Sequence, residues 1–122
     1  MVSADKITKF FSTEIGNKLK NGVSNLREFK FSILDNGNHY GENLEGERVL
    51  LQGVVDCALM EPDGITVIDF KTDKVTGETV TSVAECYRDQ VETYAEAMHR
   101  IFEMPIKAKY LYFFQLDQFV QM

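Results

Sequence analysis

The 122-residue sequence has little cysteine and no long apolar run. Its two cysteines, Cys57 and Cys86, lack the spacing of a metal site and indicate ordinary core thiols in a reducing compartment, the cytoplasm. No stretch approaches the roughly 20 consecutive apolar residues that a membrane-spanning helix needs, and the polar start does not resemble a signal peptide. The length predicts a single domain, residues 1–122, with one modest core.

The sequence also lacks a surplus of basic residues. Its 13 lysines and arginines stand against 19 aspartates and glutamates, which gives a net charge of −6. Contacts to phosphates require a basic surface, so this balance argues against tight nucleic-acid binding by the chain alone. Carboxylates of a metal site add negative charge until the ion binds, so the balance does not exclude a role in DNA processing.

Residues 53–74 are the most informative stretch, because charged side chains interrupt two apolar runs there. Asp56 lies within the first run, and Asp69 and Lys71 lie at the end of the second. Charged residues seldom occupy apolar strands unless they pair with one another or bind a metal. Alternate residues of a strand share a face, so Asp69 and Lys71 are predicted to point one way and Phe70 the other.

A turn separates the two runs, since residues 61–64 have the sequence Glu-Pro-Asp-Gly. The runs, at 48–60 and 65–71, are therefore predicted to pair as a β-hairpin. Asp56 and Asp69 lie at similar distances from the turn, so the register can place them side by side. Paired carboxylates suit Mg²⁺ or Mn²⁺, and a neighbouring lysine can stabilise charge on a phosphate or orient an attacking water. The alternative is an exposed strand end at which aspartate and lysine merely form an ion pair.

A helix is predicted at 81–103, where apolar residues recur with a period of 3.6. The positions in that pattern are Val83, Ala84, Tyr87, Val91, Tyr94, Ala95, Met98, Ile101 and Phe102. Gln90 and Tyr94 lie one turn apart, on or beside the buried face. Gln90 is either an ordinary residue of the helix flank or a contact for a phosphate or nucleotide.

The remaining predicted elements are a helix at 5–20, with a possible break near Ser12 and Thr13, and strands at 28–34, 106–114 and 119–120. Pro105 ends the long helix ahead of the second of these strands. Glu28 begins the first, and it is either a carboxylate close to the metal or a solvated strand end.

Three motifs of this chain occur in the order of a known family. They are Gly53-x-x-Asp56, Asp69-Phe70-Lys71-Thr72 and Gln90-x-x-x-Tyr94. With these motifs the chain resembles the RecB-like branch of the PD-(D/E)xK nucleases, from about residue 5 to residue 114. Five further segments resemble the C-terminal nuclease domain of AddA-type subunits of bacterial helicase–nucleases. They are Leu51-Gln52-Gly53-Val54-Val55-Asp56-Cys57, DFKTDKV at 69–75, Tyr87-Arg88-x-Gln90, the closing strand at 110–114 and an upstream "E-x-F" strand that begins at Glu28.

The resemblance implies an α/β fold with a PD-(D/E)xK, or restriction-endonuclease-like, core. In that core a central mixed sheet is flanked by helices, and the metal site lies where the second and third strands diverge. The resemblance further implies that Asp56, Asp69 and the backbone carbonyl of Phe70 hold Mg²⁺, with Mn²⁺ as a possible substitute. Lys71 would then lie close to the attacking water or the phosphate.

The family also implies a function. Gln90 and Tyr94 would orient the DNA strand or the lysine while the chain hydrolyses single-stranded DNA. In a whole protein of this type, an ATP-driven helicase and an AddB-type partner subunit take part in double-strand-break repair. The two cysteines cannot build the four-cysteine iron–sulfur site of the partner subunit, which favours the A-type over the B-type.

One feature of the family is missing. Its members usually carry a histidine ligand on a helix before the "E-x-F" strand, whereas this chain has only His39, in a predicted loop, and His99, late in the long helix. We therefore expect the chain to be a fragment of a larger protein without its upstream ligand helix. The same absence supports the alternative of a nuclease-like domain that binds DNA or a partner without cutting, and a free-standing phage-type exonuclease is a third possibility.

Overall fold

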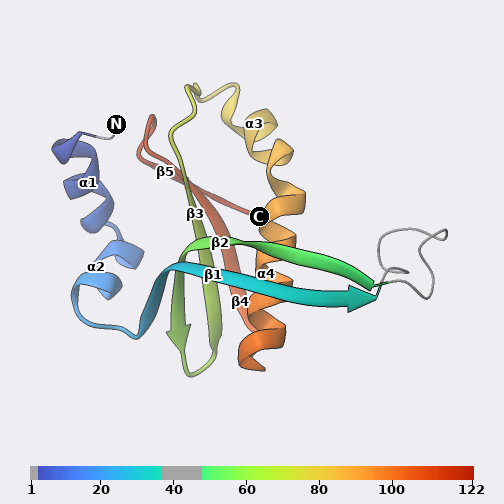
Figure 1. Ribbon diagram of the computed structural model, residues 1–122. Coiled ribbons are helices and arrows are strands. Elements are labelled where there is room, and N and C mark those ends of the chain that lie inside the picture. The colour runs from blue at the N-terminus through green and yellow to red at the C-terminus, as the bar shows by residue number, and fades with distance from the viewer. Residues whose placement is uncertain (1–2, 37–47) are drawn as a thin grey trace.

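The computed structural model describes residues 3–36 and 48–122. Within these residues five strands form one sheet in the order β1-β2-β3-β4-β5 (Figure 1). Their bounds are β1 Asn25–Asn36, β2 Arg48–Glu61, β3 Gly64–Lys71, β4 Ile106–Phe113 and β5 Gln118–Gln121. The parallel pair is β3 with β4, and the other neighbours are antiparallel. The predicted mixed α/β sheet, with a three-stranded meander followed by a helical crossover, is thus confirmed.

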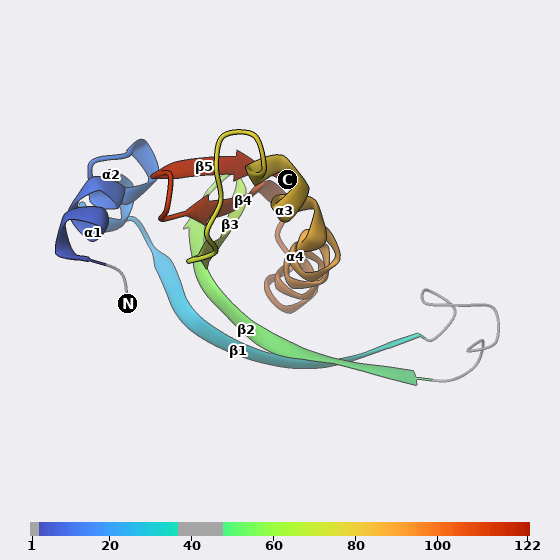
Figure 2. The same cartoon turned by 90° about the horizontal axis from the view of Figure 1, so that it is seen from above.

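Helices cover both faces of the sheet. The first pair, α1 (Ala4–Phe11) and α2 (Glu14–Lys20), lies on one side, and α3 (Val80–Cys86) and α4 (Arg88–Phe102) lie on the other (Figures 1 and 2). The break between α1 and α2 falls where the sequence predicts it, because the Thr13 side chain caps α2 by accepting a hydrogen bond from the Gly16 N–H at 3.0 Å. No helix of the described residues is long and apolar enough to span a membrane.

The long helix predicted at 81–103 is wrong in one respect, since it divides at Tyr87. This residue has φ −99° and ψ 1°, and its N–H bonds back to the Ala84 carbonyl three residues earlier. One predicted core position also differs, since Ile101 is 38% exposed. Phe102 in the same last turn packs against Phe29 of β1, as the pattern predicts.

Cys86 is predicted to lie in the core, whereas the structure exposes it at the end of α3. Val80 and Ala84 form the buried side of this short helix. A residue two positions after Ala84 lies about 200° around the helix axis, on the solvent side. Cys57 is buried, as predicted.

The hairpin of β2 and β3 has the predicted turn. Glu61 pairs with Gly64, so Pro62 and Asp63 form a two-residue connection. Gly64 has φ 146°, and a Cβ there would lie 2.9 Å from the Pro105 carbonyl oxygen, so the position requires glycine. The turn fixes the register that brings Asp56 towards β3.

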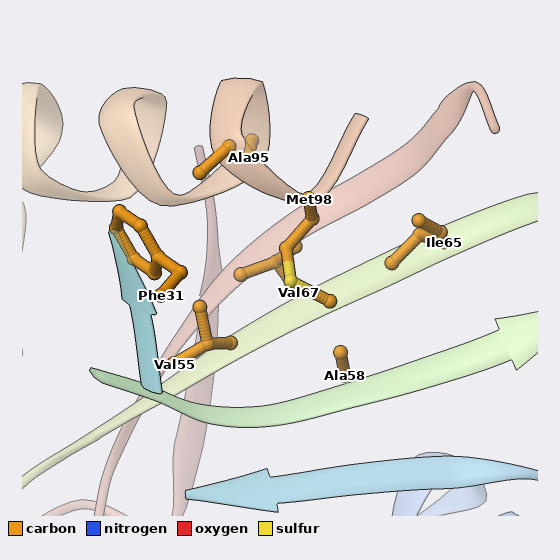
Figure 3. Packing of buried hydrophobic residues seen from close by; sticks show 8 residues of the cluster. Phe31, Val55, Ala58, Ile65, Val67, Ala95 and Met98 are labelled. Carbon is orange, nitrogen blue, oxygen red and sulfur yellow. The ribbon is translucent and has the colours of Figure 1, made fainter. Parts of the chain in front are cut away.

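Two apolar layers hold the sheet between the helices. On the α4 side, Met98 and Ala95 pack against β2 and β3 (Figure 3). The cluster comprises Phe31, Val55, Ala58, Ile65, Val67, Ala95, Ala97 and Met98. On the α1 side, the ring of Phe10 meets Phe70 at 5.1 Å and Tyr112 at 5.0 Å, both edge-on. Phe70 therefore faces α1, as the predicted alternation requires.

The β1–β2 hairpin forms a long arm that curves past α4 (Figure 2). In a regular strand every second side chain faces α4, but in both strands of this arm one extra residue separates two such side chains, at paired positions. Leu26 and Phe29 of β1 are three residues apart, and both pack in the α4-side layer. Val55 and Ala58 of β2 have the same spacing in that layer. Glu28 lies within the irregular segment of β1 with φ 49°, so the two strands kink together there.

Candidate active site

The site begins where the ladder between β2 and β3 ends, at Cys57 and Ile68. The next residues along the two strands are Asp56 and Asp69. Beyond this point the Phe70 N–H of β3 donates to the Asp56 Oδ2 at 2.9 Å. The Asp56 carboxylate thus replaces the backbone carbonyl of β2 that would accept this N–H in a continued ladder. The N–H and C=O of a strand residue point to the same side, so the Phe70 carbonyl is directed towards the same gap. Two carboxylates and one carbonyl thus converge where the strands diverge.

Asp69 is the most buried charged residue of the site, at 4% exposure. It shares a hydrogen bond with Asp56, and its Oδ2 lies 2.9 Å from the Lys71 Nζ. Burial raises the pKa of the Asp69 carboxyl to about 7, and the hydrogen bond with Asp56 adds to the rise while Lys71 opposes it. One ammonium does not neutralise two adjoining carboxylates, so the ionised group has net negative charge that a cation would balance.

Lys71 is held on several sides. Besides Asp69, its Nζ donates to the Gln90 Oε1 at 3.1 Å and lies 3.8 Å from the centre of the Tyr87 ring. The Tyr87 hydroxyl in turn donates to the Asp73 Oδ2 at 2.9 Å. The ammonium is therefore fixed by a carboxylate, an amide oxygen and an aromatic face.

Tyr94 lies one helical turn after Gln90, and its hydroxyl accepts hydrogen bonds from the Gln90 side chain and the Val54 N–H. Burial raises the pKa of this hydroxyl, the two nearby aspartates add to the rise, and the two hydrogen bonds oppose it. The Tyr94 ring lies against Gly53, where a Cβ would be 2.8 Å from the ring Cε1. The glycine of the Gly53-x-x-Asp56 motif thus leaves room for the tyrosine of the third motif.

Five of the residues singled out from the sequence therefore come together: Asp56, Asp69, Lys71, Gln90 and Tyr94. Gln90 is exposed as a residue, yet its side chain bridges the lysine and the tyrosine. Sequence reasoning alone assigns no role to Tyr87 or Asp73. The signals that could have found them are a tyrosine three residues before Gln90 and an aspartate two residues after Lys71.

The other predicted residues are placed differently. Glu28 is exposed, and its register position lies opposite Asp56, between the flanking pairs Arg27–Cys57 and Phe29–Val55. His99 is exposed, and its Nδ1 lies 2.7 Å from the carbonyl oxygen of Met104, beyond the far end of α4. His39 lies outside the described residues.

The donor set fits a divalent cation. No three side chains of histidine, cysteine, aspartate or glutamate converge within residues 3–36 and 48–122. Asp56, Asp69 and the Phe70 carbonyl are nevertheless the hard oxygen donors that Mg²⁺ and Mn²⁺ prefer, and Mg²⁺ usually keeps several waters. Burial first, and then the neighbouring Asp56, raise the pKa of the Asp69 carboxyl, and a cation bound between the two carboxylates would favour their ionised forms.

Comparison with known proteins identifies the family. The model of the PD-(D/E)XK nuclease superfamily matches residues 4–120. The chain belongs to this superfamily. Proteins named as the A-type subunit of an ATP-dependent helicase/nuclease are similar to it: that of Bacillus cytotoxicus is 35% identical over 123 residues, that of Alkaliphilus metalliredigens 38% over 125, and that of Desulforudis audaxviator 32% over 114.

These alignments cover 93%, 99% and 91% of the chain but only 10%, 10% and 9% of the respective relatives. The chain thus matches about a tenth of the length of each relative, and the expected resemblance to their nuclease domain is confirmed. As a PD-(D/E)XK nuclease domain it belongs to a group that generally uses divalent metals. The string Asp69-Phe70-Lys71 has the (D/E)xK pattern of the family name, and Asp56 precedes it in the chain.

Proposed function

We propose that this nuclease domain hydrolyses single-stranded DNA with Mg²⁺, as the exonuclease part of a bacterial helicase–nuclease that acts in double-strand-break repair. The convergence of Asp56, Asp69 and Lys71 at the fork between β2 and β3 carries the proposal. Two carboxylates beside an ammonium, in a site that excludes most solvent, suit a reaction in which charge develops on a phosphate.

The side chains have distinct tasks in this proposal. Asp56, Asp69 and the Phe70 carbonyl hold Mg²⁺, or Mn²⁺ in its place. The bound ion makes a water more acidic and reduces the charge repulsion at the scissile phosphate. Lys71 donates to a phosphate oxygen or to the attacking water, and Gln90 keeps the ammonium in place.

Tyr94 and Glu28 complete the set. Tyr94 anchors the Gln90 amide through its hydroxyl, which supports a role for both residues in orienting Lys71 or the DNA strand. Glu28 stands opposite Asp56 in register, so we keep it as a carboxylate close to the metal. The alternative is a solvated residue, although Glu28 lies within β1 and not at the strand end that the sequence predicts.

The relatives suggest the setting. They are named as parts of ATP-dependent helicase/nucleases and are about ten times longer than the matched region. We infer that the chain works as one domain within such a protein, in the cytoplasm and together with an AddB-type partner subunit. The acidic net charge of −6 agrees with this arrangement, because motor domains could supply most of the grip on DNA.

A second candidate function is a domain that binds DNA or a partner without cutting. It is favoured by the observation that no third acidic, histidine or cysteine side chain joins the two aspartates among the described residues. The two candidates differ in one measurable property, since only the nuclease consumes DNA when a divalent metal is added.

The test incubates the 122-residue chain with end-labelled single-stranded and duplex DNA in Mg²⁺, Mn²⁺ or EDTA. We expect cleavage of single strands that requires metal. Asp69→Ala should abolish cleavage and metal binding, because it leaves a single carboxylate. Loss of a residue that only supports a metal ligand already costs about 10–100-fold in affinity or activity, so loss of a ligand should cost more. Lys71→Ala should abolish cleavage but retain metal binding, since lysine is not a ligand.

Asp63→Ala is the matched control, because Asp63 is an exposed aspartate in the turn at the opposite end of β3. An Asp69→Ala chain that still cuts at the original rate would remove the catalytic assignment. Binding of DNA without cleavage in every metal would favour the second candidate. In the longer protein, Asp69→Ala should leave ATP-driven unwinding intact, because unwinding belongs to domains outside this chain.

A further inference from the structure

Tyr87 forms one wall of the Lys71 site, and nothing in the motifs above assigns it a role. The Lys71 Nζ lies 3.8 Å from the centre of its ring, well inside the distance of about 6 Å within which a cation is attracted to an aromatic face. The lysine side chain is 14% exposed, so solvent screens this attraction only weakly.

The backbone around Tyr87 is built to direct the ring to this place. Tyr87 is the junction at which α3 ends and α4 begins, with φ −99° and ψ 1°. Its N–H bonds to the Ala84 carbonyl at 2.9 Å, and its own carbonyl accepts the Val91 N–H at 3.0 Å as the first turn of α4 forms. A continuous helix would turn this side chain to a different angle from the sheet.

Asp73 fixes the far end of the ring. Its Oδ2 accepts the Tyr87 hydroxyl proton at 2.9 Å, and this bond is the largest cause of the raised pKa of the hydroxyl. A hydroxyl that donates to a carboxylate also makes the ring more electron-rich, which strengthens its attraction for a cation. Asp73 follows Lys71 by two residues, so the lysine and the anchor of its aromatic partner come from one short segment.

The arrangement leaves the lysine able to act. An ammonium has three N–H donors, and Asp69 and Gln90 accept from two of them. The Tyr87 ring restricts the position of the ammonium but is not a third hydrogen-bond acceptor of the oxygen type. One donor therefore remains for an oxygen of the substrate.

From this geometry we infer that Tyr87, anchored by Asp73, is a positioning residue that holds the Lys71 ammonium in place for a phosphate of the DNA. The inference rests on the proposed nuclease function and extends it by two residues. Tyr87 contacts the substrate only through the lysine, so its loss should lower the catalytic rate without weakening the binding of DNA or metal.

The first experiment does not depend on activity. In the chain labelled with ¹³C-lysine, the Lys71 εCH₂ signal is assigned by its loss in Lys71→Arg. Ring currents should shift this signal upfield of the other lysines in the wild type and in Tyr87→Phe, which keeps the ring. Tyr87→Leu should return it to the position of the others. A wild-type Lys71 signal at the ordinary lysine position would overturn the inference, even if the chain cuts DNA.

The second experiment measures kcat and KM on single-stranded DNA. We expect Tyr87→Phe to stay within a few fold of the wild type, and Tyr87→Leu to lose roughly tenfold in kcat with KM and Mn²⁺ affinity unchanged. Asp73→Asn should lie between the wild type and Tyr87→Phe, because its amide oxygen can still accept the Tyr87 hydroxyl proton. Tyr110→Leu is the matched control, since Tyr110 is a half-buried tyrosine that packs against Phe119 on the other side of the sheet.

The outcomes separate the two proposals. A Tyr87→Leu chain that cuts at the wild-type rate would overturn the positioning role. A wild-type chain that shows the upfield Lys71 signal but cuts no DNA would overturn the nuclease proposal and still support the placement of Lys71 by Tyr87. If Tyr87→Leu fails to fold, the position of the Lys71 signal in the wild type and in Tyr87→Phe still tests the inference, because both chains retain the ring: an upfield signal supports it and an ordinary lysine position overturns it.

Discussion

Replacement of Asp56 by asparagine should stabilise the chain in EDTA and abolish its stabilisation by divalent metal. The asparagine oxygen can still accept the Phe70 N–H, which now bonds to the Asp56 Oδ2 at 2.9 Å. Its amide can donate to the Asp69 carboxylate, and the Asp69–Lys71 ion pair at 2.9 Å is left intact. The substitution therefore replaces a contact between two carboxyl groups by a hydrogen bond of similar geometry.

The size of the effect follows from Asp69. Its pKa of about 7 exceeds the usual aspartate value by about 3 units, which corresponds to about 4 kcal/mol at most. Burial is the first cause of this rise and persists in the variant, so only the part due to Asp56 is recovered, about 1–2 kcal/mol. For a chain of 122 residues, an unfolding entropy of about 2.1 cal/mol/K per residue converts this gain to about 4–8 °C in Tm.

The gain should depend on pH. Because the folded-state pKa of Asp69 is raised, the folded wild type retains a proton that the unfolded chain releases above about pH 4. The stability linked to that proton is complete at low pH and is lost as the pH rises through about 7. The difference between Asp56→Asn and the wild type should therefore be small near pH 5 and reach its full size near pH 8.

Thermal unfolding followed by circular dichroism, at both pH values and in EDTA or Mn²⁺, measures these differences. Asp63→Asn is the control, because Lys107 lowers the pKa of the exposed Asp63 carboxyl and its loss should give no gain. A lower Tm for Asp56→Asn in EDTA would show that the two carboxyl groups do not oppose folding. An undiminished rise of Tm with Mn²⁺ would show that Asp56 is not a ligand.

Three further predictions concern packing and the thiols. Gly53→Ala should cost about 1–3 kcal/mol in urea unfolding and slow DNA cleavage, because the added methyl would lie 2.8 Å from the Tyr94 ring. Phe10→Ala should cost about 3–5 kcal/mol in the same assay, since its ring is 4% exposed at the centre of the aromatic layer. Burial raises the pKa of the Cys57 thiol to about 11, so the native chain should react with a thiol reagent at the exposed Cys86 alone and at both cysteines once unfolded.

Much of the fold could be predicted from the sequence because local and long-range signals agree. The Glu-Pro-Asp-Gly turn fixes the β2–β3 register, and the alternation through Asp69, Phe70 and Lys71 assigns each side chain to the correct face. The convergence of Asp56 with Asp69 follows from that register. These features depend on neighbours in the chain, so periodicity captures them.

Other features depend on contacts that periodicity does not contain. The interruption of the long helix at Tyr87 places an aromatic ring on Lys71, although every residue around it fits a continuous helical pattern. The function of Gly53 as space for Tyr94 appears only when the hairpin arm is laid against α4. The anchoring of Tyr87 by Asp73 likewise joins a loop to a helix junction across 14 residues.

The kink at Glu28 connects the fold to the site, and it leaves a trace in the sequence. A regular hairpin would continue the β2–β3 ladder past Cys57, which would pair Asp56 with Asp69 through the backbone and leave no gap for a metal. In both strands of the arm one extra residue separates two side chains that face α4. The Asp56 side chain, within this irregular segment, can therefore accept the Phe70 N–H, and β2 and β3 separate there. The sequence shows this irregularity as a spacing of three residues, in place of two, between apolar residues that face α4: Leu26 and Phe29 in β1, and Val55 and Ala58 in β2.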